Sequence, residues 1–388
     1  KMAGYQQRLK SFHDVLDTDV IDMKKMRNLC FTGGCPNEKG IRSICWKIFL
    51  NYLPPERSKW KSALVQQRNL YKQYINEIII LPGMKMKSKD SASGELKDHP
   101  LNPDPDSEWS GTFKENEQLI QIDKDCRRLC PDLSFFQQAT DFPCEELVSA
   151  SSNVETLRKR VEQCVLKSET VAKNRLGIYY NTVSKKRILN DQYSVLPDGK
   201  EAHWEVVERI LFLYAKLNPG LGYVQGMNEI LGPIYYTFAT DPDLECQEFA
   251  EADSFFCFMC LMSEIRDFFM KTLDDSLYGI GSKMLQLTDM VKEFDRPLWQ
   301  SLQDHELKPQ FYAFRWITLL LSQEFDLPDV LRIWDSLFAD VNRFEFLIYV
   351  CCAMLMSVRN ELLRGDFPNS MKLVQKMSAA IDLEQVLT

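Results

Sequence analysis

The chain has 388 residues, a length that fits one large domain or two to three modules. Its 47 basic and 55 acidic residues give a net charge of −8, which argues against general nucleic-acid binding because that function usually needs a basic surface. The longest apolar run, residues 346–356, is too short to cross a bilayer, and the first residues lack the apolar segment of a signal peptide. We therefore expect no integral membrane segment.

Most of the twelve cysteines lie inside apolar runs, among them Cys45, Cys257, Cys351 and Cys352. This placement predicts reduced, buried thiols in a cytoplasmic protein. The Cys-x-x-Cys pair of Cys257 and Cys260 has no matching second pair or histidine pair, so it predicts core packing. We predict no metal site.

Helical periodicity dominates the chain and predicts an all-α protein. Apolar residues at 206, 210, 213 and 214 form one stripe of a helix, with Glu205, Glu208 and Arg209 on its other faces. The stretch 83–111 is rich in Gly, Ser, Pro, Asp and Lys and predicts a long surface loop, and the irregular stretch 168–200 predicts a second connection with a turn at 197–199. In chain order, the other predicted helices are 11–29, 41–53, 60–80, 154–167, 246–271, 282–305, 309–325, 328–338 and 342–363.

Several kinds of active site have no counterpart in this sequence. A phosphate-binding loop of the form Gly-x-x-x-x-Gly-Lys-Ser/Thr is absent, so we expect no nucleotide bound in that way. No serine or cysteine nucleophile has an evident histidine partner. The glycine-rich stretch 219–229 (PGLGYVQGMNE) follows a predicted helix, whereas a dinucleotide fingerprint follows a strand.

Two short segments carry candidate site residues. Ile122, Asp125 and Arg128 are spaced by three, so a helical turn would place them on one face. The aspartate would then orient the guanidinium through a paired hydrogen bond, although a solvated helix end has the same pattern. Gln225, between Val224 and Gly226, is either a helix-start residue that binds free amides or a polar group directed at a ligand.

Other charged and aromatic residues predict architecture first. Arg42 and Trp46 are four apart, a spacing that allows a cation–π pair, but the preferred interpretation is structural, with Trp46 filling the core and Arg42 bracing a neighbour. Aromatic residues beside Arg315, Arg332 and Asp335 predict a core with an internal ion pair. The basic run 158–160 predicts a solvated helix face, or else a contact for an acidic protein surface or an anionic lipid.

Taken together, these segments resemble the TBC domain, the catalytic domain of Rab GTPase-activating proteins. The family motifs R-x-x-x-W, I-x-x-D-x-x-R and Y-x-Q appear in family order as Arg42 and Trp46, then Ile122, Asp125 and Arg128, then Tyr223 and Gln225. The resemblance implies a two-lobed, multi-helix domain with a groove for the GTPase. It covers residues 33–345, with insertions at 83–111 and 140–200, a helical extension at 1–32 and packed C-terminal helices at 346–388.

The resemblance also implies roles for individual residues. Arg128 would be an arginine finger, with Asp125 as its orienter, and Gln225 a glutamine finger that orients the attacking water. Framing the motif from Ile120 would instead place Cys126 at the arginine position. The supporting residues would be Ile122, Tyr223, Arg42 and Trp46, and the possible partner contacts Arg127 (at the rim), Gly226 and Asn228.

The implied partner is a Rab-family GTPase in its GTP state. GTP and Mg²⁺ would come with that partner, so the chain itself would need no cofactor and would have no hydrolase activity of its own. The expected location is cytoplasmic, with transient recruitment to endosomal or other vesicle membranes through the Rab. Two alternatives are a catalytically inactive Rab-binding scaffold and a helical adaptor that binds proteins through the apolar helices of 314–363.

Overall fold

The structure is a computed structural model that describes residues 2–81, 108–149, 154, 156–165, 196–197, 199–270, 279–377 and 381–387. In these ranges it contains helices and two isolated bridges, Val20–Glu56 and Ala139–Ala202, but no strand. The predicted all-α class is confirmed. The chain divides into two compact units, one formed by residues 68–228 and the other by residues 1–67 together with 229–388.

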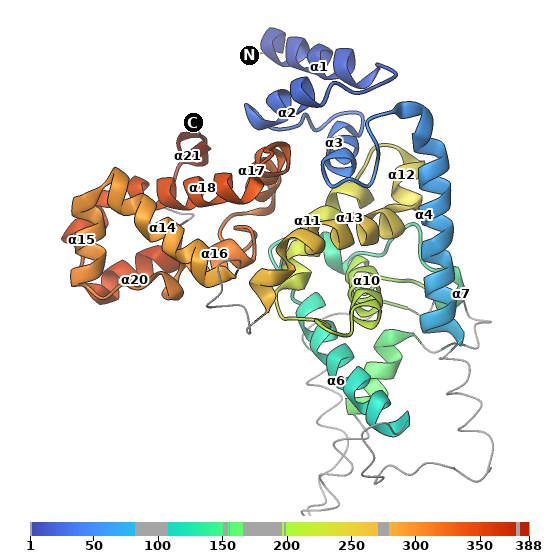
Figure 1. Ribbon diagram of the computed structural model, residues 1–388. Coiled ribbons are helices and arrows are strands. Elements are labelled where there is room, and N and C mark those ends of the chain that lie inside the picture. Colours follow the sequence, from blue (N-terminus) through green and yellow to red (C-terminus); the bar gives the residue numbers. More distant parts are fainter. Residues whose placement is uncertain are drawn as a thin grey trace, which may run out of the picture. The chain divides into compact units, whose positions relative to one another are not determined.

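The 68–228 unit is built around a buried helix, α10 (His203–Leu217). Helix α6 (Glu108–Cys126) packs against α10 (Figure 1). The π-helical turn η2 (Ile75–Ile80) and the short 3-10 helix η3 (Ser134–Gln137) also pack against α10. The other described helices that lie wholly in this unit are α7 (Glu145–Val148) and residues 157–165. The boundary between the two units falls within helix α4 (Trp60–Tyr74), after Gln67.

The unit of residues 1–67 and 229–388 has two groups of packed helices. Helix α17 (Leu327–Ala339) packs against α2 (Met23–Phe31), α3 (Ile41–Phe49) and α18 (Arg343–Ser357). Helix α14 (Ile280–Phe294) packs against α15 (Arg296–Asp304), α16 (Ala313–Thr318) and α18. The N-terminal helices are α1 (Met2–Leu16), α2 (Met23–Phe31), α3 (Ile41–Phe49) and η1 (Arg57–Lys59). The helices that follow are α11 (Met227–Ala239), α12 (Leu244–Glu248), α13 (Ala250–Ile265), η4 (Arg266–Phe269), α14 (Ile280–Phe294), α15 (Arg296–Asp304), η6 (Pro309–Phe311), α16 (Ala313–Thr318), α17 (Leu327–Ala339), α18 (Arg343–Ser357), α19 (Arg359–Arg364), α20 (Phe367–Gln375) and α21 (Leu383–Leu387).

The first group of helices closes around three aromatic rings. Trp46 of α3 and Trp334 and Phe338 of α17 are all buried. The ring centroids of Trp46 and Phe338 lie 5.1 Å apart and those of Trp334 and Phe338 lie 5.4 Å apart, within the range of favourable aromatic contacts. Trp46 therefore fills the core, as the sequence predicts.

Several predicted helices are interrupted in the structure, each by a local side-chain or backbone effect. The predicted helix 11–29 is two helices, because Asp22 caps the start of α2 by accepting a hydrogen bond from the Lys25 amide at 3.1 Å. The predicted helix 282–305 breaks at Asp295, which caps α15 ahead of a proline at its first turn. The predicted helix 309–325 keeps only α16 as α-helix, because Leu320 and Leu321 adopt positive φ.

Smaller differences affect the other boundaries. The predicted helix 246–271 is divided into α12, α13 and η4, the helix 342–363 is divided into α18 and α19, and α3 ends four residues before the predicted 53. The predicted loop 83–111 is wrong at its end, since α6 begins at Glu108, and residues 83–107 lie outside the described part. The turn at 197–199 is confirmed by a bond from the Lys200 amide to the Pro197 carbonyl at 3.1 Å. Most of 168–200 lies outside the described residues.

Candidate functional site

The arginine motif lies at the C-terminal end of α6. Ile122 is fully buried and anchors the last turn, and Asp125 is buried three residues later. Arg128 follows the end of the helix, where its amide donates to the Asp125 carbonyl at 3.2 Å. The Arg128 side chain is 63% exposed. The motif thus keeps its isoleucine and aspartate inside and presents its arginine to solvent.

The Arg128 side chain donates one hydrogen bond to the Asp125 carboxylate, whereas the sequence predicts a paired hydrogen bond. Its Nη2 donates to Asp125 Oδ1 at 3.3 Å, while Nε donates to the backbone carbonyl of Lys124 at 3.0 Å. An ion pair with one partner so exposed contributes about 0–1 kcal/mol. Arg128 can therefore leave Asp125 for another anion at little energetic cost.

The carboxylate of Asp125 joins the arginine motif to the Y-x-Q motif. The Tyr223 hydroxyl donates to Asp125 Oδ2 at 2.8 Å across 98 residues of sequence. Asn228 Nδ2 donates to the Asp125 backbone carbonyl at 3.3 Å, and Asn228 Oδ1 lies 3.3 Å from the Tyr223 hydroxyl. Tyr223 and Asn228 are buried. One buried carboxylate therefore binds Arg128 on one oxygen and, on the other, Tyr223, which lies two residues before Gln225.

The loop that carries Gln225 depends on glycines at two positions. Gly222 has φ +66°, and a Cβ there would lie 2.5 Å from Nε2 of Gln118, a side chain of α6. Gly226 has φ +102°, a backbone conformation that favours glycine. Gln225 is exposed between buried Gly226 and half-buried Val224. The glycines thus let the loop lie against α6 while its glutamine stays at the surface.

Arg127 lies inside the unit, although the sequence predicts a rim position. Its side chain is 17% exposed, its Nε donates to Asp123 Oδ2 at 2.8 Å, and its guanidinium carbon lies 4.4 Å from the Trp204 ring centroid. Burial alone would lower the pKa of Arg127, but the hydrogen bond and charge of Asp123 raise it. The two adjacent arginines therefore occupy different environments.

The carboxyl group of Glu208, a residue of α10, is affected by the charges of Asp123 and Arg127. Glu208 is buried, and burial raises the pKa of its carboxyl well above the usual value, with Asp123 and Glu205 adding to the rise. The sequence places Glu208, Glu205 and Arg209 on the outer faces of this helix, and the structure buries all three. Glu205 accepts from the Ala202 amide at 2.8 Å, and Arg209 pairs with Glu201 at 3.1 Å.

The basic run 158–160 is also more buried than predicted. Arg158 is buried with its Nε 3.5 Å from Glu205 Oε1, and Arg160 donates to Asn116 Oδ1 at 2.8 Å. Of the three, Lys159 is the exposed residue. The solvated helix face predicted for this run is therefore wrong for two of its three residues.

In the other unit, Arg42 and Trp46 meet on Asp335. Arg42 Nε donates to Asp335 Oδ1 at 3.0 Å, and Trp46 Nε1 donates to the same oxygen at 2.8 Å. The Cys35 amide donates to Oδ2 at 2.7 Å. Among the described residues, the cation–π contacts form elsewhere and not between Arg42 and Trp46. The prediction that Arg42 braces a neighbour is confirmed, and the stacking that the spacing allows is replaced by a shared carboxylate.

The internal ion pairs near residues 315–335 have partners that the sequence leaves unspecified. Asp335 pairs with Arg42, and Arg315 Nε donates to Glu324 Oε1 at 2.6 Å. Arg332 donates to the Ser336 hydroxyl at 2.7 Å.

Within the described residues, one group of three side chains could ligate a metal: Cys30, Cys35 and Cys45. The sequence-based predictions do not include this group. Its C-x4-C-x9-C spacing could have drawn attention to it, but the spacing does not reveal contact.

Comparisons with known proteins identify relatives of this chain. The RabGAP-TBC family model, described as the Rab-GTPase-TBC domain, matches residues 151–363. TBC1 domain family member 13 of Homo sapiens is 58% identical over 377 residues, covering 96% of this chain and 94% of that protein. A TBC domain-containing protein of Schizosaccharomyces pombe is 37% identical over 435 residues, covering 96% of this chain and 70% of that protein.

A solved structure supports the fold. The crystal structure of the Ypt/Rab-GAP domain of Gyp1p aligns with a TM-score of 0.64 over 98% of this chain and 95% of that one, at 21% identity. The family model covers more than half of the chain, and the relatives cover nearly all of it. On these grounds the chain belongs to the RabGAP-TBC family.

Proposed function

We propose that the chain is a GTPase-activating protein that accelerates GTP hydrolysis by a Rab-family GTPase, with Arg128 and Gln225 supplied in trans. The single observation that carries this assignment is the Asp125 carboxylate, which binds both Arg128 and Tyr223. That contact brings two segments together and leaves exposed the two polar side chains that the family resemblance assigns to catalysis. Membership of a RabGAP family supports the choice of partner.

The chemistry of the two side chains suits this role. Charge develops on the transferring phosphoryl group and its leaving oxygen, and a permanently charged, planar guanidinium stabilises it. The glutamine amide has both a donor and an acceptor, so it can hold the attacking water while it meets the backbone of the GTPase. The weak pairing of Arg128 with Asp125 keeps the guanidinium oriented yet available to the nucleotide.

The partner supplies everything else that the reaction requires. GTP and Mg²⁺ enter with the Rab, and the chain contributes positioning and charge. None of the described helices is long and apolar enough to cross a membrane. Recruitment to endosomal or other vesicle membranes would follow from binding a membrane-anchored Rab.

Single-turnover phosphate release from a panel of GTP-loaded Rabs tests the proposal. Arg128→Ala and Gln225→Ala should each slow stimulated release by about a hundredfold or more, because a finger supplied in trans contributes about 10³–10⁵ in rate. Arg266→Ala and Gln300→Ala are matched controls, since Arg266 is 66% exposed and Gln300 is exposed on α15. Both controls should retain wild-type stimulation.

The same panel separates the inactive scaffold from the activator. If the wild-type chain binds a GTP-loaded Rab without stimulating release, the scaffold is correct. If stimulation persists in both finger variants, the assignment of Arg128 and Gln225 is wrong.

A further inference from the structure

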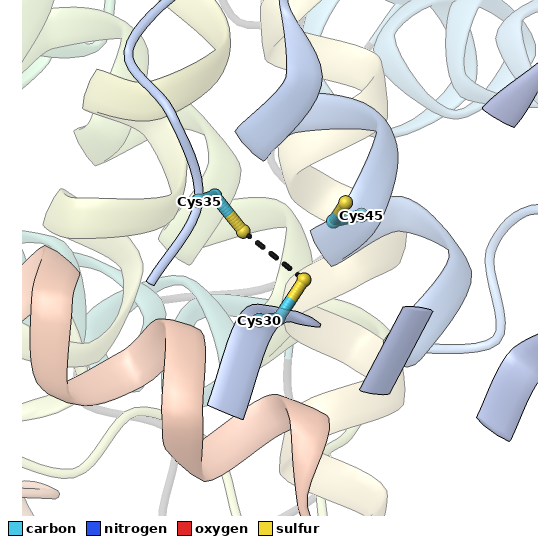
Figure 2. A group of neighbouring side chains, drawn as sticks. All are labelled: Cys30, Cys35 and Cys45. Carbon is cyan, nitrogen blue, oxygen red and sulfur yellow. Dashed lines mark hydrogen bonds between the residues drawn. The ribbon is translucent and has the colours of Figure 1, made fainter. Parts of the chain in front are cut away.

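Three thiols meet in the interior of the unit formed by residues 1–67 and 229–388. Cys30 belongs to α2, Cys45 belongs to α3, and Cys35 lies in the loop between them. Figure 2 shows the sulfurs of Cys30 and Cys35 directed at each other, with Cys45 beside them. The Cys30 and Cys35 sulfurs are 3.4 Å apart, and all three lie within 4.8 Å of one another. Cys30 and Cys45 are inaccessible, and Cys35 is 6% exposed.

The backbone amide and the backbone carbonyl of Cys35 are both hydrogen-bonded. Its amide donates to Asp335 Oδ2 at 2.7 Å, and its carbonyl accepts from Arg42 Nη2 at 3.0 Å. The preceding Gly34 has φ +70°, and a Cβ there would lie 2.8 Å from Cδ of Arg332. These contacts hold the thiol of Cys35 toward the two helical thiols, so the cluster is organised by its surroundings.

We propose that Cys30, Cys35 and Cys45 form a closed trithiolate site for a thiophilic d¹⁰ cation, Cu⁺ or Zn²⁺. Thiolates are the ligands that select these two ions among the biological metals. A Zn–S distance of about 2.3 Å sets ligand sulfurs about 3.8 Å apart in a tetrahedral site. The Cys30 and Cys35 sulfurs are 3.4 Å apart and all three sulfurs lie within 4.8 Å of one another, so binding needs only small side-chain movements.

Binding exchanges protons for the metal without any change of oxidation state. Burial first of all raises the pKa of Cys30 and Cys35 well above the usual value, so these side chains are neutral thiols without a compensating cation. Each thiol releases one proton to the buffer as its sulfur bonds the metal. The cation offsets part of the thiolate charge: the three thiolates keep a net charge of −2 with Cu⁺ and of −1 with Zn²⁺.

The number of ligands distinguishes the two ions. In the described part of the chain, no fourth histidine, cysteine or carboxylate side chain joins the group. Structural zinc sites are almost always four-coordinate, whereas Cu⁺ is satisfied by three thiolates. The site therefore favours Cu⁺, and it is a structural site because its closed environment admits no substrate.

Anaerobic titration of the reduced, full-length protein tests the site. Cu⁺ is added against a chromophoric Cu⁺ chelator, Zn²⁺ is added in a parallel arm, and X-ray absorption counts the sulfur neighbours of the bound ion. We expect one tightly bound Cu⁺ per chain with three sulfur neighbours. Cys30→Ala and Cys45→Ala should each weaken binding by about tenfold or more, equivalent to about 1.4 kcal/mol. Cys257→Ala, which removes a buried thiol of α13, should leave it unchanged.

Circular dichroism and urea unfolding check that the variants fold. Cys35→Ala gives a second test, since Cys35 lies in the loop between α2 and α3 and not within a helix. Equal copper uptake by the wild type and the three cysteine variants would overturn the proposal, because other thiols would then hold the ion. Preferential binding of Zn²⁺ would overturn the three-coordinate copper assignment.

Discussion

Arg127 and Arg128 are adjacent in sequence and differ in almost every physical property. Arg128 is 63% exposed and weakly paired, whereas Arg127 is 17% exposed, paired with Asp123 and stacked on Trp204. An exposed arginine contributes little to stability, and a buried one whose removal strands a carboxylate contributes much more. The same residue type therefore has a structural role at one position and is available for catalysis at the next.

Alanine substitutions should separate these two roles by stability. Arg127→Ala leaves the Asp123 carboxylate unpaired beside the Glu208 carboxyl and should lower the free energy of unfolding by about 3 kcal/mol. Arg128→Ala should change it by less than about 0.5 kcal/mol. Urea unfolding followed by circular dichroism measures both. Equal losses would mean that the environment of Arg127 is not the one described.

Helix α10 has buried charged groups on the faces outside its predicted apolar stripe. Its buried residues include Glu205, Glu208 and Arg209. The carboxyl of Glu208 has a raised pKa, so the folded state holds a proton that the unfolded state releases near pH 4.5. A carboxyl group with a raised folded-state pKa makes its full contribution to the free energy of unfolding below pH 4.5. That contribution is lost as the pH rises through the folded-state pKa.

Glu208→Gln should remove this pH dependence. The variant should gain stability relative to the wild type as pH increases from 5 to 8, because a neutral amide has no ionisation cost in the core. Urea unfolding at four pH values measures the difference, and Glu248→Gln, an exposed change outside α10, serves as the control. A difference that stays constant with pH would show that Glu208 ionises as easily in the folded state as in the unfolded one.

At the level of elements, periodicity predicts where helices occur and misses where they stop. The breaks at Asp22 and Asp295 depend on a single side chain accepting a backbone amide, and the same residue type occurs inside helices elsewhere. The end of α16 depends on two leucines in a left-handed conformation, which leucine rarely adopts. Helix content can therefore be predicted from an amphipathic pattern, whereas helix ends require the tertiary contacts that stabilise them.

The candidate site shows the same division. Motif order predicts that Arg128 and Tyr223 belong to one site, and the structure joins them through Asp125. The burial of Arg127 against Trp204 could not be predicted, because the contact joins residues 77 positions apart and depends on how their segments pack. The shared use of Asp335 and the contact of three thiols likewise depend on how distant helices pack.

At the scale of the whole molecule, Asp335 ties the two ends of the chain together within one unit. It is fully buried, and it accepts hydrogen bonds from Arg42, Trp46 and Cys35, which lie about 290 to 300 residues earlier in the sequence. A buried carboxylate in this position is stabilising only while all its partners remain, because losing one partner leaves an uncompensated charge.

Asp335→Leu should lower the free energy of unfolding by about 3–5 kcal/mol, since the Arg42 guanidinium loses its carboxylate in a mostly buried position. The double variant Arg42→Met with Asp335→Leu should be less destabilised than the single variant, because no charge is left alone. Urea unfolding of all four members of the cycle measures the coupling. Additive effects would exclude a direct interaction, and exposed Asp289→Ala should be close to neutral.

The separation of Arg42 and Asp335 also matters while the ribosome is still making the protein. Residues 1–67 belong to a unit that is finished only by residues 229–388, and 293 residues separate Arg42 from its carboxylate. At about 5–20 residues per second, translation takes about 15–60 seconds to cover that distance. Throughout that interval the apolar faces of α2 and α3 have no α17 to cover them, so the nascent chain emerges as a client for chaperones that bind exposed apolar segments.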